Sequence, residues 1–390
     1  MRQSRSARRA RAAGQRMRDR HPHGGGRVRR GMAGRRRGFR RAAHAGRPEA
    51  VDQRRRRAAR HGVAAARAGG AGDRGRGSMN DVKHDHDAPA FVANAASWYE
   101  ASARQRIDGL LDAGSFSEFL GPAERVTSPH LPLFDLPQQF DDGMVVGHGR
   151  LDGQPVFVAA QEGRFMGGAF GEVHGAKLTG LLRAAREVGK PVLILFDTGG
   201  VRLQEANAGE LAIAEIMRAL VEARTAGVPV IGLIGGRAGC YGGGGLLAAC
   251  CSALAVSEQG RISVSGPEVI ETNRGVEEFD AKDRALIWRT MGGKHRRLIG
   301  GAERYVADTP DAFRAAALEL IGRAPKFDAA MLRAEQARLE ARVERFGACK
   351  DALDVWCSLG ASAPEAIPGM PDDAFVTLAD QLQESSHDAR

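Results

Sequence analysis

Two short apolar runs, each followed by a glycine turn and a helical pattern, limit what this chain can fold into more than any other feature. The first run, 191–196, leads into Gly199 and Gly200, and the second, 228–234, leads into Gly242 and Gly243. Short runs without polar interruption are typical of strands buried on both faces of a parallel sheet. Glycine lets backbone N–H groups approach a ligand closely, and a helix N-terminus adds partial positive charge. Each turn can therefore hold an oxyanion.

A third unit of the same kind precedes these two. Apolar stretches between 144 and 160 are separated by Asp152 and Gly153, which is a hairpin signal. A glycine turn with Gly167 and Gly168 and a helical pattern over 173–188 follow. Right-handed crossovers would wind such units into an α/β spiral of repeated strand, strand and helix.

The charge of the chain is concentrated at its beginning. Residues 1–78 contain 25 arginines, no lysine and four acidic residues, whereas the remainder carries a net charge of −11. A segment so poor in apolar residues is expected to be disordered. It could contact nucleic acid or act as a transit peptide. We favour a third interpretation, that translation starts at Met79, because a GC-rich upstream sequence encodes Arg, Ala and Gly but little Lys.

Several classes of protein are disfavoured by what the sequence lacks. No apolar run of about 18 residues and no signal-peptide pattern occur, so we expect a soluble, cytoplasmic protein without membrane contact. The five cysteines show no CxxC pair, which argues against a zinc ribbon and a disulfide framework. We expect no bound metal and no nucleic-acid partner for the folded part.

The remaining segments complete the expected organisation. Amphipathic spacing predicts a helix over 95–111, further strands are expected at 253–256, 261–264 and 303–306, and helices at 312–321 and 326–346. The last thirty residues, which include several prolines, are expected to be loose. We therefore divide the chain into 1–78, a main domain over 79–325, and a C-terminal helical extension with a loose tail over 326–390.

The glycine turns favour backbone electrostatics over other chemistry. Gly199 and Gly200 are adjacent, so the GxGxxG register of dinucleotide sites is absent, and no Walker lysine follows. No GxSxG nucleophile motif occurs at either turn, and His148, His174 and His295 lie outside both. One oxyanion donor stabilises a transition state by about 3 to 4 kcal/mol, so two such turns could lower a barrier without an acid–base pair.

Three motifs resemble those of the carboxyltransferase family. Residues 197–205 (DTGGVRLQE) resemble its SGGARxQE signature, residues 167–175 resemble GGSxGxxxG, and residues 265–271 (SGPEVIE) resemble GPxVIE. The resemblance extends over roughly 98–310 and is greatest to the beta subunits of biotin-independent malonate decarboxylases. It implies the crotonase-like fold of the ClpP/crotonase superfamily, in agreement with the spiral expected above.

The resemblance also implies roles for individual residues. Gly242 and Gly243 would hold the oxygen of a thioester enolate, while Gly199, Gly200 and Tyr241 would complete the catalytic site. The residues expected at the substrate are Gly167, Gly168, Arg202 and Gln204. The proton donor stays open between Tyr241, Glu205 and a partner residue, and buried structural roles are equally compatible with Arg202, Gln204 and Glu205.

The implied reaction is decarboxylation of a malonyl thioester to an acetyl thioester. The thioester would be carried on the dephospho-coenzyme A-type prosthetic group of an acyl carrier protein, with no biotin and no cofactor bound covalently to this chain. A homologous gamma subunit would share the active site. Two alternatives remain: the carboxyltransferase beta subunit of a biotin-dependent acyl-CoA carboxylase, and a non-catalytic scaffold that tolerates changes at the glycine turns.

Overall fold

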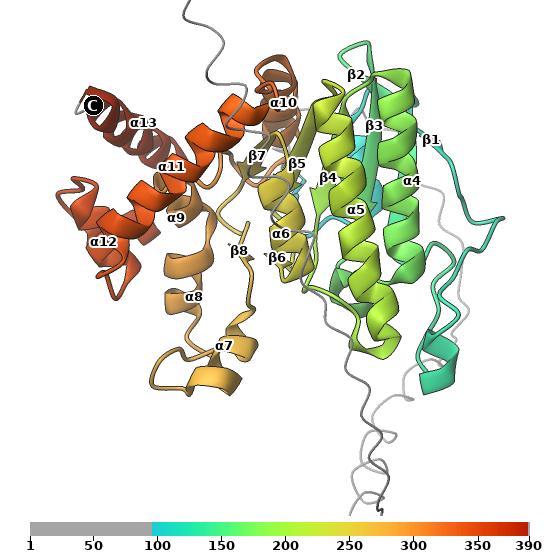
Figure 1. The fold of residues 1–390 in the computed structure, drawn as a ribbon, viewed down its shortest axis with the longest axis horizontal. Helices are drawn as coiled ribbons and strands as arrows, with labels where there is room; N and C mark the ends of the chain where they lie inside the picture. The colour runs from blue at the N-terminus through green and yellow to red at the C-terminus, as the bar shows by residue number, and fades with distance from the viewer. Residues whose placement is uncertain (1–95, 389–390) are drawn as a thin grey trace, which may run out of the picture. The chain divides into compact units, whose positions relative to one another are not determined.

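A seven-stranded sheet forms the centre of the protein in a computed structural model that describes residues 96–388 (Figure 1). Its strands lie in the order β1-β2-β3-β4-β5-β7-β9, antiparallel from β1 to β3 and parallel from β3 onward. The strands are β1 Ser117–Glu118, β2 Met144–Leu151, β3 Gln154–Gln161, β4 Val192–Phe196, β5 Val230–Ile234, β7 Ala253–Val256 and β9 Arg304–Tyr305. The order follows the chain, as expected for a spiral of consecutive units, and the crotonase-like fold class is confirmed.

Helices cover both faces of this sheet. Helices α4 (Glu172–Val188), α5 (Asn207–Thr225) and α6 (Gly243–Cys250) pack on one face, and α3 (Ala103–Leu110) and α10 (Pro310–Gly322) pack on the other. Alternate side chains of each strand therefore enter two separate cores: in β4, Ile194 and Phe196 join the first, and Leu193 and Leu195 the second. This explains why the parallel strands read as unbroken apolar runs.

Two short strands lie beyond the ends of the main strands and carry the second glycine turn. Strand β6 (Cys240–Tyr241) pairs in parallel with β8 (Ile262–Ser263), and an isolated bridge joins Thr198 to Cys240. The small sheet thus links the end of β4 to the start of α6. This link places the two glycine turns beside each other.

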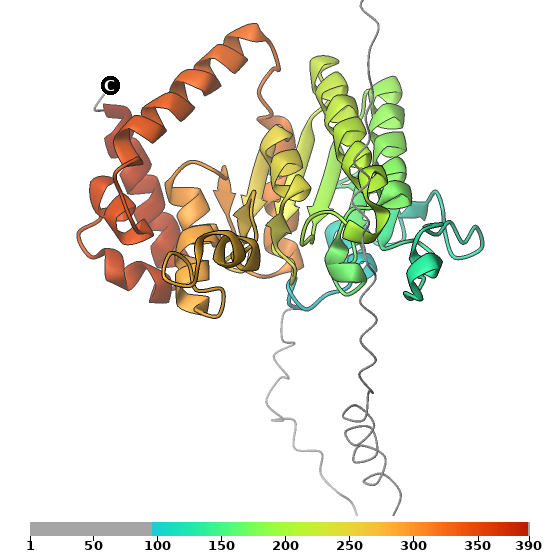
Figure 2. The ribbon, with the colours of Figure 1, turned by 60° about the horizontal axis from the view of Figure 1, so that its bottom comes forward.

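The C-terminal third is helical and packs on the end of the sheet at β9. It contains α7 Pro267–Arg274, α8 Arg284–Met291, α9 Gly293–Leu298, α11 Ala329–Phe346, α12 Ala352–Ser358, a 3-10 helix η4 Pro364–Gly369 and α13 Asp372–Asp388 (Figure 2). Trp356, Ile367 and Phe375 form a third apolar core with Leu298 and Tyr305. All described residues belong to one compact unit, Pro89–Arg390.

Two sequence expectations need correction or comment here. The last thirty residues are not loose. Their prolines fall within η4 and just before α13, where they break no α-helix. Helix α13 buries Phe375 and Ala379 on one face. The expectations of a disordered 1–78 and a start at Met79 concern residues outside the described part. No helix in residues 96–388 is long and apolar enough to cross a membrane.

Candidate active site

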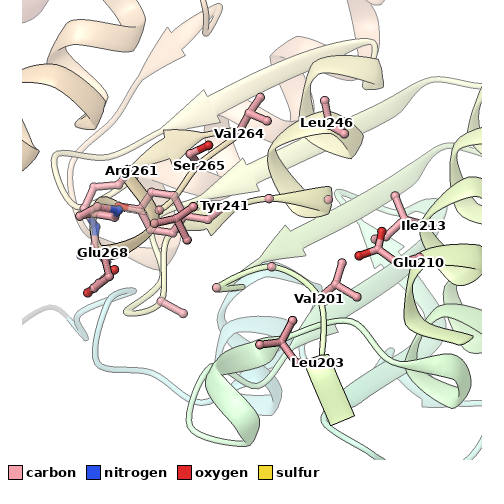
Figure 3. Close-up of a pocket in the computed structure, with 18 of the residues that line it drawn as sticks. Val201, Leu203, Glu210, Ile213, Tyr241, Leu246, Arg261, Val264, Ser265 and Glu268 are labelled. Atoms are coloured by element: carbon pink, nitrogen blue, oxygen red, sulfur yellow. The ribbon is translucent and has the colours of Figure 1, made fainter. Parts of the chain in front are cut away.

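The two glycine turns meet at one cavity of about 720 Å³ (Figure 3). Its wall includes five of the residues expected at a catalytic site: Gly199, Gly200, Tyr241, Gly242 and Gly243. In Figure 3, Tyr241, Arg261 and Glu268 lie on one side of the cavity, and Val201 and Glu210 on the other. The expectation that both turns contribute to a single site is therefore supported by their position.

Thr198 holds the two turns together. Its N–H donates to Gly239 O at 2.8 Å, and its carbonyl accepts from Tyr241 N at 3.0 Å. Its hydroxyl Oγ1 accepts from Gly200 N at 3.1 Å, so a single buried residue bonds to both turns. A side chain at Gly244 would come within 2.4 Å of the Thr198 methyl group, which shows how closely α6 approaches this residue.

The second turn presents free N–H groups. Gly242 has φ 57° and ψ −129°, a conformation that other residues adopt only with strain, and it directly precedes α6. The N–H groups of Gly242 and Gly243 donate to no acceptor among the described residues, and both glycines are half-buried on the cavity wall. Val201 and Ile213 lie behind Gly243 and close this side of the cavity. Two free N–H groups at the start of a helix can bind an oxyanion.

The first turn differs from what the sequence predicts. Gly199 N donates to Gly167 O at 2.8 Å, and Gly200 N is taken by the Thr198 hydroxyl, so neither N–H is free for a ligand. Gly199 and Gly200 shape the cavity, and the expectation that their own N–H groups bind an oxyanion is wrong. Glycine is still favoured at 200 because its φ is 130°, whereas an added Cβ would make only ordinary contacts, at 3.8 Å from Tyr241 O and 3.9 Å from Gly242 Cα.

Gly167 and Gly168 do not line the cavity, contrary to their expected contact with substrate. They lie in a short 3-10 helix, η2 (Met166–Gly168), with positive φ angles of 62° and 66°. A Cβ atom at Gly168 would come within 1.7 Å of Asp197 O, so glycine is needed there for packing. Their part is to support the first turn through the bond between Gly167 O and Gly199 N.

Arg202 and Gln204 also lie outside the cavity lining. Arg202 is buried and donates to Asp142 Oδ2 at 2.7 Å and to Glu205 Oε1 at 3.0 Å. Glu205 accepts further bonds from Ser128 Oγ and Glu172 N, and although burial alone would raise its pKa, these bonds hold the pKa below its usual range. An ionised, buried Glu205 away from the cavity does not suit proton donation.

Tyr241 lines the cavity with its ring and not with its hydroxyl. Its ring lines the cavity, but its hydroxyl is shielded from solvent and has no partner among the described residues. Burial raises the pKa of this hydroxyl, so the oxygen keeps its proton at neutral pH. Phe279, Ile287 and Met291 surround the ring in a small apolar cluster.

Sequence reasoning missed the charged residues of the cavity, Glu210, Arg261 and Glu268. Glu210 lies in the first turn of α5, and the guanidinium of Arg261 stacks over Trp288 at 4.6 Å. The run 265–271 was interpreted only as a family signature, although it contributes directly to the wall. Each of the three follows a glycine within two residues, but Glu210 lies in the first turn of α5, Arg261 directly precedes β8 and Glu268 lies in α7, so no other common sequence signal marks them.

Asp197 was also missed, although it directly precedes the first turn. Its carboxylate accepts from Arg106 Nη1 at 2.8 Å and from Ala238 N at 2.6 Å, and all but 2% of the residue is buried. It therefore ties helix α3 to the loop that leads into the second turn. Cys240 is also buried there, and burial raises the pKa of its thiol well above the ordinary value, so the thiol is unreactive.

No group of three or more His, Cys, Asp or Glu able to hold a metal occurs in residues 96–388. The arrangement offers backbone donors, a shielded phenol and three charged side chains at a half-open cavity. Free backbone N–H groups of this kind can stabilise an oxyanion.

Comparison with known proteins agrees with this geometry. A family model described as the carboxyl transferase domain matches residues 100–347. The malonyl-S-ACP:biotin-protein carboxyltransferase of Malonomonas rubra is 40% identical over 312 residues, which cover 74% of this chain and 96% of that protein. The propionyl-CoA carboxylase beta chain of Saccharopolyspora erythraea is 34% identical over 224 residues, 57% of this chain and 39% of the relative.

Solved structures give the same result. A chain of a Pseudomonas malonate decarboxylase hetero-tetramer, solved in complex with malonate, superposes with a TM-score of 0.63 at 41% identity. The match covers 68% of this chain and 98% of that one. A Pseudomonas malonate decarboxylase hetero-dimer matches with a TM-score of 0.51 at 38% identity, over 63% of this chain and 96% of that one.

Proposed function

The chain belongs to the carboxyltransferase family, and within it we propose that the protein is the beta-type subunit of a malonate decarboxylase. Its substrate would be a malonyl thioester on an acyl carrier protein. The observation that carries this proposal is the pair of free N–H groups at Gly242 and Gly243, which face a cavity at the start of α6.

The proposed reaction follows from the stability of the carbanion. The bond between the α-carbon and the carboxylate breaks, CO₂ leaves, and the electron pair moves into the thioester carbonyl to give an enolate. The N–H groups of Gly242 and Gly243 stabilise the negative oxygen, and the α6 N-terminus adds to this effect. One proton added to the α-carbon then gives the acetyl thioester, so the reaction consumes one proton per CO₂ released.

The carboxylate that leaves would enter a region with few countercharges. Glu210 and Glu268 line the cavity, and the guanidinium of Arg261 is already engaged by Trp288 and by Gln259 O. Weak pairing of the substrate carboxylate favours loss of CO₂, because a strong ion pair would stabilise the ground state more than the transition state. The charge pattern thus supports decarboxylation.

We propose that the proton comes from a second subunit. Glu205 is buried, ionised and outside the cavity lining, and the Tyr241 hydroxyl is shielded, so neither group is positioned to donate a proton to a molecule in the cavity. Beside its charged residues, the cavity has three highly exposed apolar side chains, with Leu203 89%, Val264 61% and Val269 51% exposed. Exposed apolar residues around an open site are typical of a protein interface, and a gamma-type subunit would complete the site there.

A second candidate function has specific support. The relative from Malonomonas rubra is named a biotin-protein carboxyltransferase, so the carboxyl group could be transferred to biotin on another protein. The same N–H groups would stabilise the same enolate. The two candidates differ only in whether free CO₂ or carboxybiotin is the first product.

Co-expression with the gamma-type subunit and carrier protein separates these candidates. We expect CO₂ release from the malonyl-loaded carrier protein without biotin or ATP, and no inhibition by avidin. Release that requires a biotinylated acceptor and is blocked by avidin would favour carboxyl transfer. No turnover under either condition would refute both and leave the scaffold interpretation.

A further inference from the structure

A second cavity, of about 610 Å³, lies beneath helix α11 and apart from the glycine turns. Its wall is made by the C-terminal half of α6, the start of β7, the Gly300–Gly301 turn and one face of α11. Helix α11 is 18 residues long and buries none of them. The helix therefore covers this cavity with half-buried side chains, and it bonds to the wall through Arg338 Nη1, which donates to Gly300 O at 3.0 Å.

Three guanidinium groups line the cavity, and two of them, Arg224 and Arg342, form no ion pair with a described residue, although Glu303 and Glu335 of the same wall attract them electrostatically. Arg342 is half-buried and makes no hydrogen bond or ion pair with any described residue. Arg224 is only 5% exposed, and its Nε and Nη2 atoms have no partner among these residues. Its remaining contacts are a bond from Nη1 to Cys250 O at 2.8 Å and stacking on Phe327 at 4.4 Å.

Both acidic residues of the cavity already have hydrogen-bond partners within its wall. Glu335 is held by Arg338 through Nε at 2.8 Å and Nη2 at 2.5 Å. Glu303 accepts from Leu254 N at 2.7 Å. Burial lowers the pKa of both Arg224 and Arg342, which expresses the cost of shielding unpaired cations from water.

The rest of the wall is apolar, with Leu254, Met331 and Leu339 among its side chains. We propose that this cavity binds a small organic anion, whose carboxylate or phosphate group lies at Arg224 and Arg342 and whose apolar body lies against these side chains. Arg224 also donates through Nη1 to the carbonyl of Cys250 at the end of α6, and this bond leaves Nε and Nη2 available for an anion.

The site lies at the other end of α6 from the proposed active site. Gly243 and Leu246 line the first cavity, and Ala248, Ala249 and Cys251 line the second. The proposal does not depend on the reaction catalysed at the first cavity, because it concerns binding to the isolated full-length chain.

Isothermal titration of the full-length chain with phenyl phosphate and with phenylacetate tests the proposal. We expect saturable binding of at least one probe, tighter than that of inorganic phosphate or acetate because of the apolar body. Arg342→Gln should weaken this binding about tenfold. Arg333→Gln is the matched control, since Arg333 is an exposed arginine of the same helix outside the cavity and its loss should leave binding unchanged. Both variants keep the arginines of residues 1–78, so these arginines cannot account for a difference in binding between the two variants.

Which of the two probes binds shows whether the cavity prefers a phosphate ester or a carboxylate. Equal binding by both variants, or binding with no preference for the probe with an apolar body, would overturn the proposal as non-specific attraction. If neither probe binds and Arg342→Gln instead weakens assembly with a second subunit, the arginines serve a protein contact and the proposal is also wrong.

Discussion

Replacing Gly242 by Ala tests whether the second turn carries the catalytic donors. Gly242 has φ 57° and ψ −129°, and an added Cβ would lie 3.2 Å from Gly200 Cα. An L-residue in such a conformation is destabilised by about 1–3 kcal/mol. The chain can relieve this strain only by rotating the peptide units of the turn, which moves the N–H groups of Gly242 and Gly243 from their present positions.

The expected loss of activity follows from the value of one donor. Removal of one oxyanion donor lowers kcat by about 10²–10³ in other enzymes. We therefore expect Gly242→Ala to lower kcat at least about a hundredfold in the reconstituted complex, with KM changed less than about threefold. The assay is CO₂ release from malonyl-loaded carrier protein, with urea unfolding to measure stability.

Gly227→Ala provides a matched control. Gly227 has φ 84°, lies before β5, and has no atom within 4 Å of an added Cβ. The Gly227→Ala variant should lose a similar amount of unfolding free energy to Gly242→Ala but keep its kcat. If Gly242→Ala folds, assembles and keeps kcat within threefold of the unmodified protein, then the N–H groups of this turn do not stabilise the transition state.

Three further predictions concern residues around the site and the core. Thr198→Val should lower the free energy of unfolding by about 1–3 kcal/mol, because it leaves the buried Gly200 N–H without its acceptor. Thr198→Ser keeps the hydroxyl and should change the free energy of unfolding by less than about 1 kcal/mol. Equal losses for the two variants in urea unfolding would contradict this role of the hydroxyl. Tyr241→Phe should keep kcat within threefold and leave the pH profile between 6 and 9 unchanged, and a large drop in kcat would instead make Tyr241 the proton donor. Burial lowers the pKa of His295 to about 3, so below pH 6.5 the unfolded chain binds a proton that the folded chain does not, and stability falls with decreasing pH by up to about 1.4 kcal/mol per unit. His295→Gln should reduce this slope in urea unfolding from pH 7 to 5, while Gln in place of the exposed His148 should leave it unchanged.

Strands β4, β5 and β7 were predictable because each is buried on both faces and so reads as an unbroken apolar run, whereas the two-residue strands β1 and β6 were not predicted. The position of the second turn was predictable for a related reason, since a glycine run directly after a strand and before a helix has few structural alternatives. Both inferences use only neighbouring residues. Both can therefore be made without knowledge of the rest of the fold.

The sequence does not decide the role of residues whose partners are distant in the chain. Arg202 is separated from Asp142 by 60 residues, and only the folded chain shows that this pair is buried away from the cavity. The same holds for the first turn, where the acceptor of Gly199 N is the carbonyl of Gly167. A motif gives the residue types of a site, but not which donors remain free once the chain is folded.

The bonds around Thr198 have a consequence for how the site should open. The N–H groups of Thr198, Gly199 and Tyr241 each donate to a carbonyl of a different segment, so none can exchange its hydrogen with water unless these segments separate together. The N–H groups of Gly242 and Gly243 have no such acceptor and should exchange rapidly. Hydrogen exchange should therefore show a slowly exchanging frame around two fast amides, and substrate analogues should slow those two selectively.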